Sequence, residues 1–113
     1  MAIDNETQEE ISQLQIIQQQ LQMIMSQEQI FQQKIIELKS SLEELKKTDK
    51  PVYKLVGEAL IQKNSKELIK DLEKEEEQLN VRLKSFESQE KRMQSKAKEL
   101  QEKVTKKLQK KKD

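Results

Sequence analysis

A seven-residue repeat of apolar side chains runs through both halves of the sequence and constrains the fold more than any other feature. In the first half it occupies Leu14, Leu21, Glu28, Ile35 and Leu42, together with Ile17, Ile24, Phe31, Leu38 and Leu45. In the second half it occupies Leu72, Leu79, Phe86, Met93 and Leu100, together with Ile69, Glu76, Leu83, Glu90, Ala97 and Val104. Only three of these positions are not apolar, and each of the three is Glu. Such a repeat predicts coiled-coil helices, whereas a disordered chain of similar polarity would not show it.

The ends of the two helices are also legible. We expect the first helix at about residues 6–47, ended by Thr48, Asp49 and Pro51, and the second at about 65–110, capped by Asn64 or Ser65. Helices of matched length joined by a short insert fold back as an antiparallel pair, with a left-handed supercoil. The predicted fold class is therefore mainly α, and the whole chain, residues 1–113, is expected to form a single domain.

The insert between the helices, PVYKLVGEALIQK at 51–63, differs from everything around it. It contains the only Pro, Tyr and Gly of the chain and predicts a β-hairpin at about 52–62, with Gly57 supplying the positive φ of a two-residue turn. In that register Leu55 faces Leu60. The candidate oligomerisation residues are Val52, Tyr53, Leu55, Val56, Gly57, Ala59, Leu60 and Ile61.

This hairpin has two interpretations. A lone two-stranded hairpin is marginal in water, and this one has apolar residues on both faces. It either folds as a hydrophobic loop onto its own helices or assembles with hairpins of other chains into a shared sheet or barrel.

Composition excludes several function classes. The chain has no Cys and no His, and it lacks a Gly-rich phosphate loop, a nucleophile–base pair and a cluster of metal ligands. We therefore expect no enzymatic activity, no cofactor and no metal. The acidic start MAIDNETQEE is unlike a signal peptide, and no apolar run approaches the ~20 residues of a membrane span, so we expect a cytoplasmic protein without a membrane partner.

Charge is distributed unevenly along the chain. Residues 1–33 carry five acidic and no basic side chains, and residues 91–113 carry ten basic and three acidic ones, so antiparallel helices would bring opposite charges together. The basic end consists of Lys103, Lys106, Lys107, Lys110, Lys111 and Lys112. It is a solvated helix end, a docking surface for an acidic partner, or a nucleic-acid contact. We expect no nucleic acid, because the chain offers no aromatic stacking platform beside these lysines.

Several apolar residues fall outside the repeat. They either widen the packed stripe, an option for Ile11 and Met25 beside it, or stay exposed, as expected for Ile16, Met23 and Ile30 at one outer heptad position. Exposed Met and Ile on a charged chain suit a surface that accepts varied partners. The candidate residues of such a partner-binding surface are Ile3, Ile11, Ile16, Met23, Met25, Val104 and Leu108.

Taken together, the hairpin VYKLVGEALI, the stretch QLQIIQQQLQMIMSQEQ and the second-helix stretch LNVRLKSFESQEKRMQSKAKELQEKV resemble the prefoldin family, in its archaeal beta class and the eukaryotic subunit-six type. This resemblance implies a subunit of a hexamer of two alpha-type and four beta-type chains, whose hairpins form a β-barrel body and whose coiled coils clasp unfolded proteins at their tips. It also implies transfer of these clients to a group II chaperonin, to which the basic end would dock.

The resemblance thus implies an ATP-independent chaperone subunit, whose exposed apolar residues Ile3, Ile11, Ile16, Met23, Met25, Val104 and Leu108 would contact clients. The alternative from another class is a structural coiled-coil scaffold or tether without chaperone activity.

Overall fold

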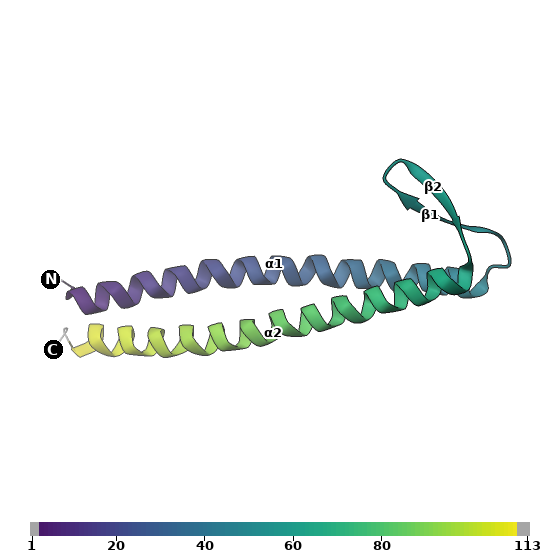
Figure 1. The fold of residues 1–113 in the computed structure, drawn as a ribbon. Coiled ribbons are helices and arrows are strands. Elements are labelled where there is room, and N and C mark those ends of the chain that lie inside the picture. Colours follow the sequence, from purple (N-terminus) through teal and green to yellow (C-terminus); the bar gives the residue numbers. More distant parts are fainter. Residues whose placement is uncertain (1–2, 111–113) are drawn as a thin grey trace. The chain divides into compact units, whose positions relative to one another are not determined.

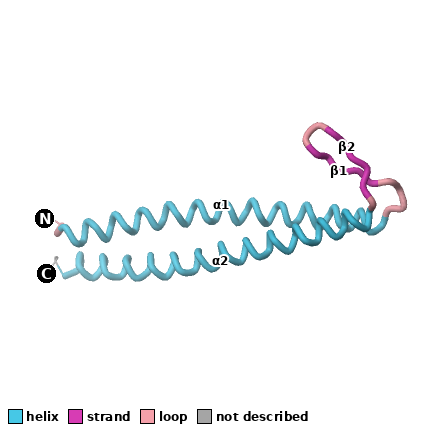
Figure 2. The backbone as a smooth tube through the Cα atoms, in the orientation of Figure 1, coloured by secondary structure: helices cyan, strands magenta, loops and turns pink. Residues whose placement is uncertain are grey.

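The computed structural model describes residues 3–110, which form two helices and one hairpin in the order α1 (Asn5–Lys47), β1 (Val52–Val56), β2 (Ala59–Lys63) and α2 (Ser65–Lys110) (Figure 1). The two helices contain almost all of the described chain, and the strands are confined to the connection between them (Figure 2). The predicted fold class, mainly α with two long antiparallel helices and one central hairpin, is confirmed. The chain divides into two compact units, one built from residues up to Glu28 and from Ser85 onward, the other from Gln29 to Lys84.

Both helices begin at a side chain that caps their first turn. Asp4 precedes α1, and its Oδ1 accepts a hydrogen bond of 2.7 Å from the backbone N–H of Thr7. Asn64 precedes α2, and its Oδ1 accepts a hydrogen bond of 2.9 Å from the N–H of Lys66. Of the two caps considered for α2, Asn64 is therefore the one used. Lys46 and Lys47 lie in the last turn of α1, where cations suit the negative end of the helix dipole.

In the first unit the N-terminal part of α1 packs antiparallel against the C-terminal part of α2. Leu14, Ile17 and Leu100 form a buried cluster, which Leu21, Met93 and Ala97 extend. All six lie at the predicted heptad positions. The pairing of residues near 14 with residues near 100 is the register that an antiparallel fold requires.

The second unit continues the same packing and adds the hairpin. Phe31, Ile35 and Leu42 of α1 are buried. The guanidinium of Arg82 on α2 lies 5.1 Å from the centre of the Phe31 ring, a cation–π contact that lets a charged residue flank the apolar stripe. Leu68, at the start of α2 and outside the predicted repeat, is buried as well. It lines a hollow with Leu45, Leu72 and residues of β1, so it lies near the hairpin and outside the positions of the heptad repeat.

The hairpin has the predicted register. β1 and β2 pair antiparallel, with Leu55 opposite Leu60 and Val56 opposite Ala59. Gly57 has φ of 62°, the left-handed conformation that the first turn position requires and that residues with a Cβ adopt reluctantly. Among residues 3–110 the sheet has only these two strands, so the outer edge of each strand lacks a neighbour there.

Candidate interaction surfaces

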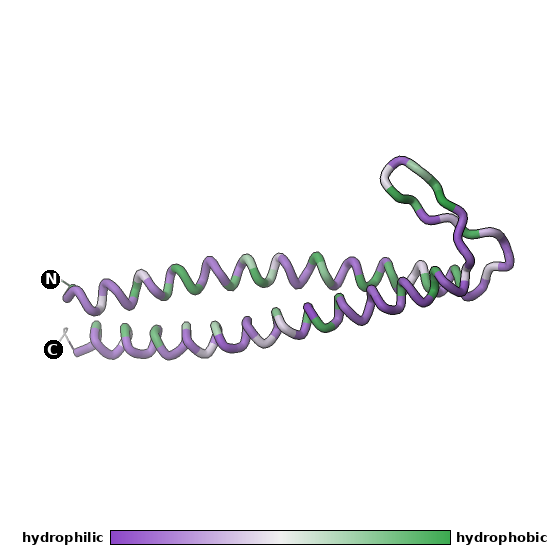
Figure 3. The backbone as a smooth tube through the Cα atoms, in the orientation of Figure 1, coloured by the Kyte–Doolittle hydropathy of each residue, from purple (hydrophilic) through white to green (hydrophobic). Residues whose placement is uncertain are grey.

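The hairpin exposes apolar side chains on both of its faces. Five of them have between 44% and 69% of their surface exposed: Tyr53, Leu55, Val56, Leu60 and Ile61. The strand pairing places Tyr53, Leu55 and Leu60 on one face and Val56 and Ile61 on the other. Figure 3 shows hydrophobic residues along both strands. The helices of the second unit therefore leave most of this apolar surface uncovered, unlike a loop folded onto its own helices.

The outer side of α1 exposes a second group of apolar residues. In the first unit, Ile16 is 54% exposed and Met23 is 70% exposed, and Met25 is exposed on a different side of the helix. Ile11 is half-buried, so it widens the packed stripe instead. Ile30 and Ile36 are exposed on α1 in the second unit. Exposed aliphatic side chains are thus a repeated feature of this helix.

Two candidate residues near the end of α2 differ from each other. Val104 is only 5% exposed, because it continues the buried stripe of α2 against α1. A side chain this deeply buried is not available to a client, so Val104 is not part of the client-binding surface proposed below. Leu108, one turn further on, is 38% exposed, and Ile3, just before α1, is similarly exposed.

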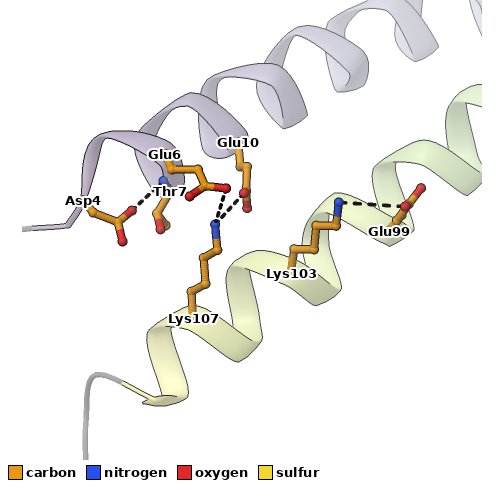
Figure 4. Close-up of polar contacts among 7 residues, drawn as sticks. All are labelled: Asp4, Glu6, Thr7, Glu10, Glu99, Lys103 and Lys107. Carbon is orange, nitrogen blue, oxygen red and sulfur yellow. Dashed lines mark hydrogen bonds and ion pairs between the residues drawn. The ribbon is translucent and has the colours of Figure 1, made fainter.

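The basic end of α2 is partly neutralised by the acidic start of α1 (Figure 4). The Nζ of Lys107 donates a hydrogen bond of 2.7 Å to Glu10 and lies 3.3 Å from a carboxylate oxygen of Glu6. The hydrogen bond from Lys107 to Glu10, followed by that to Glu6, raises the pKa of the lysine above its ordinary value, against the opposing effect of burial. The expected complementarity of the two charged ends is therefore realised at Lys107.

The other lysines of this end are differently placed. Lys103 lies 4.0 Å from Glu99 on its own helix (Figure 4), and Lys106 and Lys110 are exposed. Lys111 and Lys112 lie outside the described residues. Because Lys107 is held by two carboxylates, Lys103, Lys106 and Lys110 are the described residues available to an acidic partner.

Two features of the first unit were missed from the sequence. Thr7 is fully buried, and its Oγ1 has no hydrogen-bond partner among residues 3–110. Its position seven residues before Leu14 continues the repeat, so extending the repeat by one heptad would have revealed it. The second feature is that Glu28 lies opposite Glu90. Their hydrogen bond, then burial, then repulsion from Glu90 and Glu87 raise the pKa of Glu28 to about 7.

Neither a metal-holding cluster nor a membrane-spanning helix occurs in the part of the chain that the structure describes. Residues 3–110 contain no group of three or more acidic side chains placed to hold a metal ion. Neither α1 nor α2 is long and apolar enough to cross a membrane.

The fold and these surfaces define a class of protein: an antiparallel helical coiled coil whose two helices are joined by one apolar β-hairpin. A family model described as Prefoldin subunit matches residues 8–111. The chain is 35% identical over 104 residues to the prefoldin subunit beta of Thermococcus onnurineus, covering 90% of each chain. It is 38% identical over 104 residues to that of Methanospirillum hungatei, covering 90% of this chain and 87% of the relative.

A solved structure is similar over the same extent. The crystal structure of the prefoldin beta subunit from Thermococcus strain KS-1 has a TM-score of 0.85 and 34% identity, and covers 93% of this chain and 94% of that one. The chain belongs to the prefoldin family, among its beta subunits. Membership implies a chaperone role within a prefoldin complex, and it confirms the expectation of a non-enzymatic protein.

Proposed function

We propose that this chain is a subunit of a hetero-oligomeric, ATP-independent chaperone that captures non-native polypeptides and passes them to a group II chaperonin. One observation carries the proposal: a chain with 38% charged residues keeps two separate groups of aliphatic side chains exposed, on the hairpin and on α1. A monomeric coiled coil that only spaces two partners has no use for either group.

The hairpin residues are proposed to hold the assembly together. Their apolar side chains on two faces and their unpaired strand edges are suited to pairing with hairpins of neighbouring chains, which bury both at once. Following the family, these neighbours are alpha-type and further beta-type subunits, in a hexamer of two alpha-type and four beta-type chains whose hairpins form a β-barrel body. The whole chain then acts as one prefoldin-like domain in the cytoplasm.

Capture is proposed to be passive. Ile16, Met23 and Met25 offer contacts that are individually weak, with Ile3 and Leu108 adding to them near the chain ends. Several subunits holding one client raise its effective concentration at each site, so avidity replaces a nucleotide-driven step. Release follows when the client is transferred, and Lys103, Lys106 and Lys110 are proposed to dock to an acidic surface of the chaperonin, with Lys111 and Lys112 beyond the described residues.

The test is suppression of aggregation. A chemically denatured client is diluted into buffer with or without the assembled complex, and light scattering is followed without nucleotide. We expect scattering to fall as the complex approaches the molar amount of client. Unchanged scattering from a complex of verified mass would contradict the proposal and favour a structural tether.

A further inference from the structure

Methionine is the only sulfur-containing residue type in this sequence, which has four Met and no Cys. Three of the four lie among the described residues, at Met23 and Met25 of α1 and Met93 of α2. A thioether is readily oxidised to a sulfoxide, and the exposure of each Met determines which of several reacts first. The three positions differ in exposure, so the structure indicates which of them an oxidant reaches.

Met23 and Met25 are open to solvent on two sides of α1. Met23 is 70% exposed and Met25 is 49% exposed. Ile24 lies between them and is buried in the packed stripe, and a helix turns by about 100° per residue, so the two Met lie on either side of Ile24. An oxidant therefore reaches both Met side chains while the apolar side chain between them stays covered.

Met93 has the opposite placement. It is half-buried and packs against the cluster of Leu14, Ile17 and Leu100 in the first unit. Oxidation there would put a polar oxygen into the packed stripe and destabilise the coiled coil. The two Met that are reached first are thus those whose oxidation leaves the packing of the helices intact, and this property distinguishes a reversible control from damage to the fold.

The surroundings of the two exposed Met are uncharged. The segment Ile11–Gln27 of α1 has no charged side chain. Met23 occupies the same heptad position as Ile16, which is 54% exposed. Oxidation converts an apolar side chain into a polar one, so it changes the apolar character of this part of α1 without the masking effect that neighbouring charges would have.

We propose that Met23 and Met25 form a reversible oxidation site, at which a hydroperoxide converts the thioethers to sulfoxides and thereby weakens the capture of clients. This inference rests on the proposed function and adds a control to it. A bound client excludes water from the side chains that it covers, and a sulfoxide loses its hydration there, whereas an apolar thioether benefits from being covered. Because neither Met lies in the packed stripe, the subunit stays folded and assembled, and it recovers when the sulfoxides are reduced.

The reaction consumes one hydroperoxide for each Met. The sulfur lone pair attacks one peroxide oxygen, the S–O bond forms and the O–O bond breaks. Sulfur loses two electrons and the peroxide gains them, and with hydrogen peroxide the leaving oxygen takes up the proton of the transferred oxygen and departs as water. The reverse step consumes two thiols, which become a disulfide while the sulfoxide oxygen leaves as water, and methionine sulfoxide reductases catalyse it.

The test oxidises the assembled complex before it meets a client. Hydrogen peroxide is added in steps, catalase removes it, and fragment-ion mass spectrometry of the peptides measures the gain of one oxygen at each Met. We expect Met23 and Met25 to react at least about threefold faster than Met93. The amount of complex that halves the light scattering of a denatured client should rise about fivefold, and treatment with methionine sulfoxide reductases should reverse this rise. The mass of the complex and its helical circular dichroism should stay unchanged.

Matched variants locate the effect. Met23→Leu with Met25→Leu keeps apolar side chains without sulfur, so the amount of this variant that halves the scattering should be the same with and without peroxide. Met93→Leu, the control, removes the sulfur from the packed stripe and should keep the peroxide response of the parent complex. Met23→Gln with Met25→Gln makes both positions permanently polar and should hold clients less well than the parent even without peroxide.

The outcomes separate this inference from the proposed function. If the untreated complex holds no denatured client, the proposed function fails and this inference fails with it. If the complex holds the client equally well with both Met oxidised, or if the double Leu variant responds to peroxide as the parent does, the inference is overturned and the proposed function stands. Loss of helical signal or of assembled mass on oxidation at Met23 and Met25 would show that the reaction damages the fold, which also overturns the inference.

Discussion

Glu28 of α1 faces Glu90 of α2 in the packed stripe of the first unit, where the heptad repeat otherwise places apolar residues. One oxygen of Glu28 is buried, and Gln94 donates a hydrogen bond of 3.2 Å to Glu90. Two neighbouring ionised carboxylates repel each other, so the pair is more stable when Glu28 holds a proton and donates it to Glu90. Glu87 adds further negative charge to the same place.

This pairing predicts a pH-dependent stability. The hydrogen bond to Glu90 raises the pKa of Glu28 from 4.5 to about 7, so the folded chain binds this proton more tightly than the unfolded chain. The contribution of Glu28 to stability is then most favourable below about pH 4.5, declines as pH rises to about 7 and is least favourable above that. We expect Glu28→Gln to melt about 2–4 °C above the parent chain at pH 8 and to lose this advantage by pH 5, measured by circular dichroism.

The control for this experiment is Glu9→Gln, an exposed carboxylate elsewhere on α1. Its melting temperature should follow that of the parent chain across the pH range. Parallel pH profiles for Glu28→Gln and the parent would show that the carboxyl pair does not govern this stability.

Thr7 predicts a stabilising substitution. Its side chain is fully buried, and Oγ1 has no hydrogen-bond partner among the described residues. Val has nearly the same shape without the hydroxyl, so Thr7→Val removes an unsatisfied polar group and should raise the free energy of unfolding by about 1 kcal/mol. Urea denaturation at a fixed protein concentration measures this change.

Thr7→Ser supplies the opposite change at the same position. It keeps the hydroxyl and deletes the buried methyl group, so it should lower the free energy of unfolding by about 1 kcal/mol. If Val proves the less stable of the two variants, the hydroxyl has a partner that this structure does not reveal.

The exposed hairpin pair predicts a separation of assembly from folding. Leu55 and Leu60 lie opposite each other on one exposed face. Replacing both with Asp should reduce the mass of the oligomer in light scattering after size exclusion, because charges are excluded from a buried sheet, while the helical signal stays the same. Lys54→Glu, which makes the same change of two units in net charge on the other face of the hairpin, is the control. An oligomer of unchanged mass in the Leu variant would refute the role proposed for this face.

Substitution of Gly57 tests whether assembly depends on the conformation of the hairpin turn. It has φ of 62° and no other heavy atom within 4 Å of a Cβ built on it, so Gly57→Ala costs backbone strain of about 1 kcal/mol without a clash. We expect the Ala variant to dissociate at higher protein concentration than the parent in dilution experiments. Gly57→Asn, which tolerates this conformation better, should lie between them, and an Ala variant as tightly assembled as the parent would mean that other contacts impose the turn.

Most of the fold could be predicted because it depends on local, periodic signals. The heptad repeat identified Leu14, Ile17 and Leu100 as core residues, and Gly57 identified the turn, since each signal acts over a few neighbouring residues. The repeat did not identify Leu68, because this residue lies outside the heptad positions and is buried where Leu45, Leu72 and residues of β1 surround one hollow, which is a tertiary arrangement. The sequence did not decide whether Asn64 or Ser65 caps α2. Both residue types are good caps, so only the backbone geometry of the helix start shows which one accepts the hydrogen bond.

The candidate surfaces were less predictable than the fold. The sequence identified Ile16 and Met23 as outside the packed stripe, and their exposure agrees with this, but it grouped Val104 with them although Val104 is buried. Likewise, a run of lysines in a sequence does not indicate which lysine forms an ion pair. Lys107 is held by Glu6 and Glu10, which are about a hundred residues away along the chain.

The sequence by itself determined the secondary structure, the antiparallel pairing and the family of this protein. Periodicity, turn residues and charge asymmetry indicate these features because each depends only on the order of residues along the chain. Only the tertiary structure decided which polar side-chain groups meet: Glu28 with Glu90, and Lys107 with Glu6 and Glu10, while the Thr7 hydroxyl has no hydrogen-bond partner among the described residues. The reason is physical. Apolar packing follows the average pattern of a helix face, whereas each polar interaction depends on the distance and burial of two particular atoms.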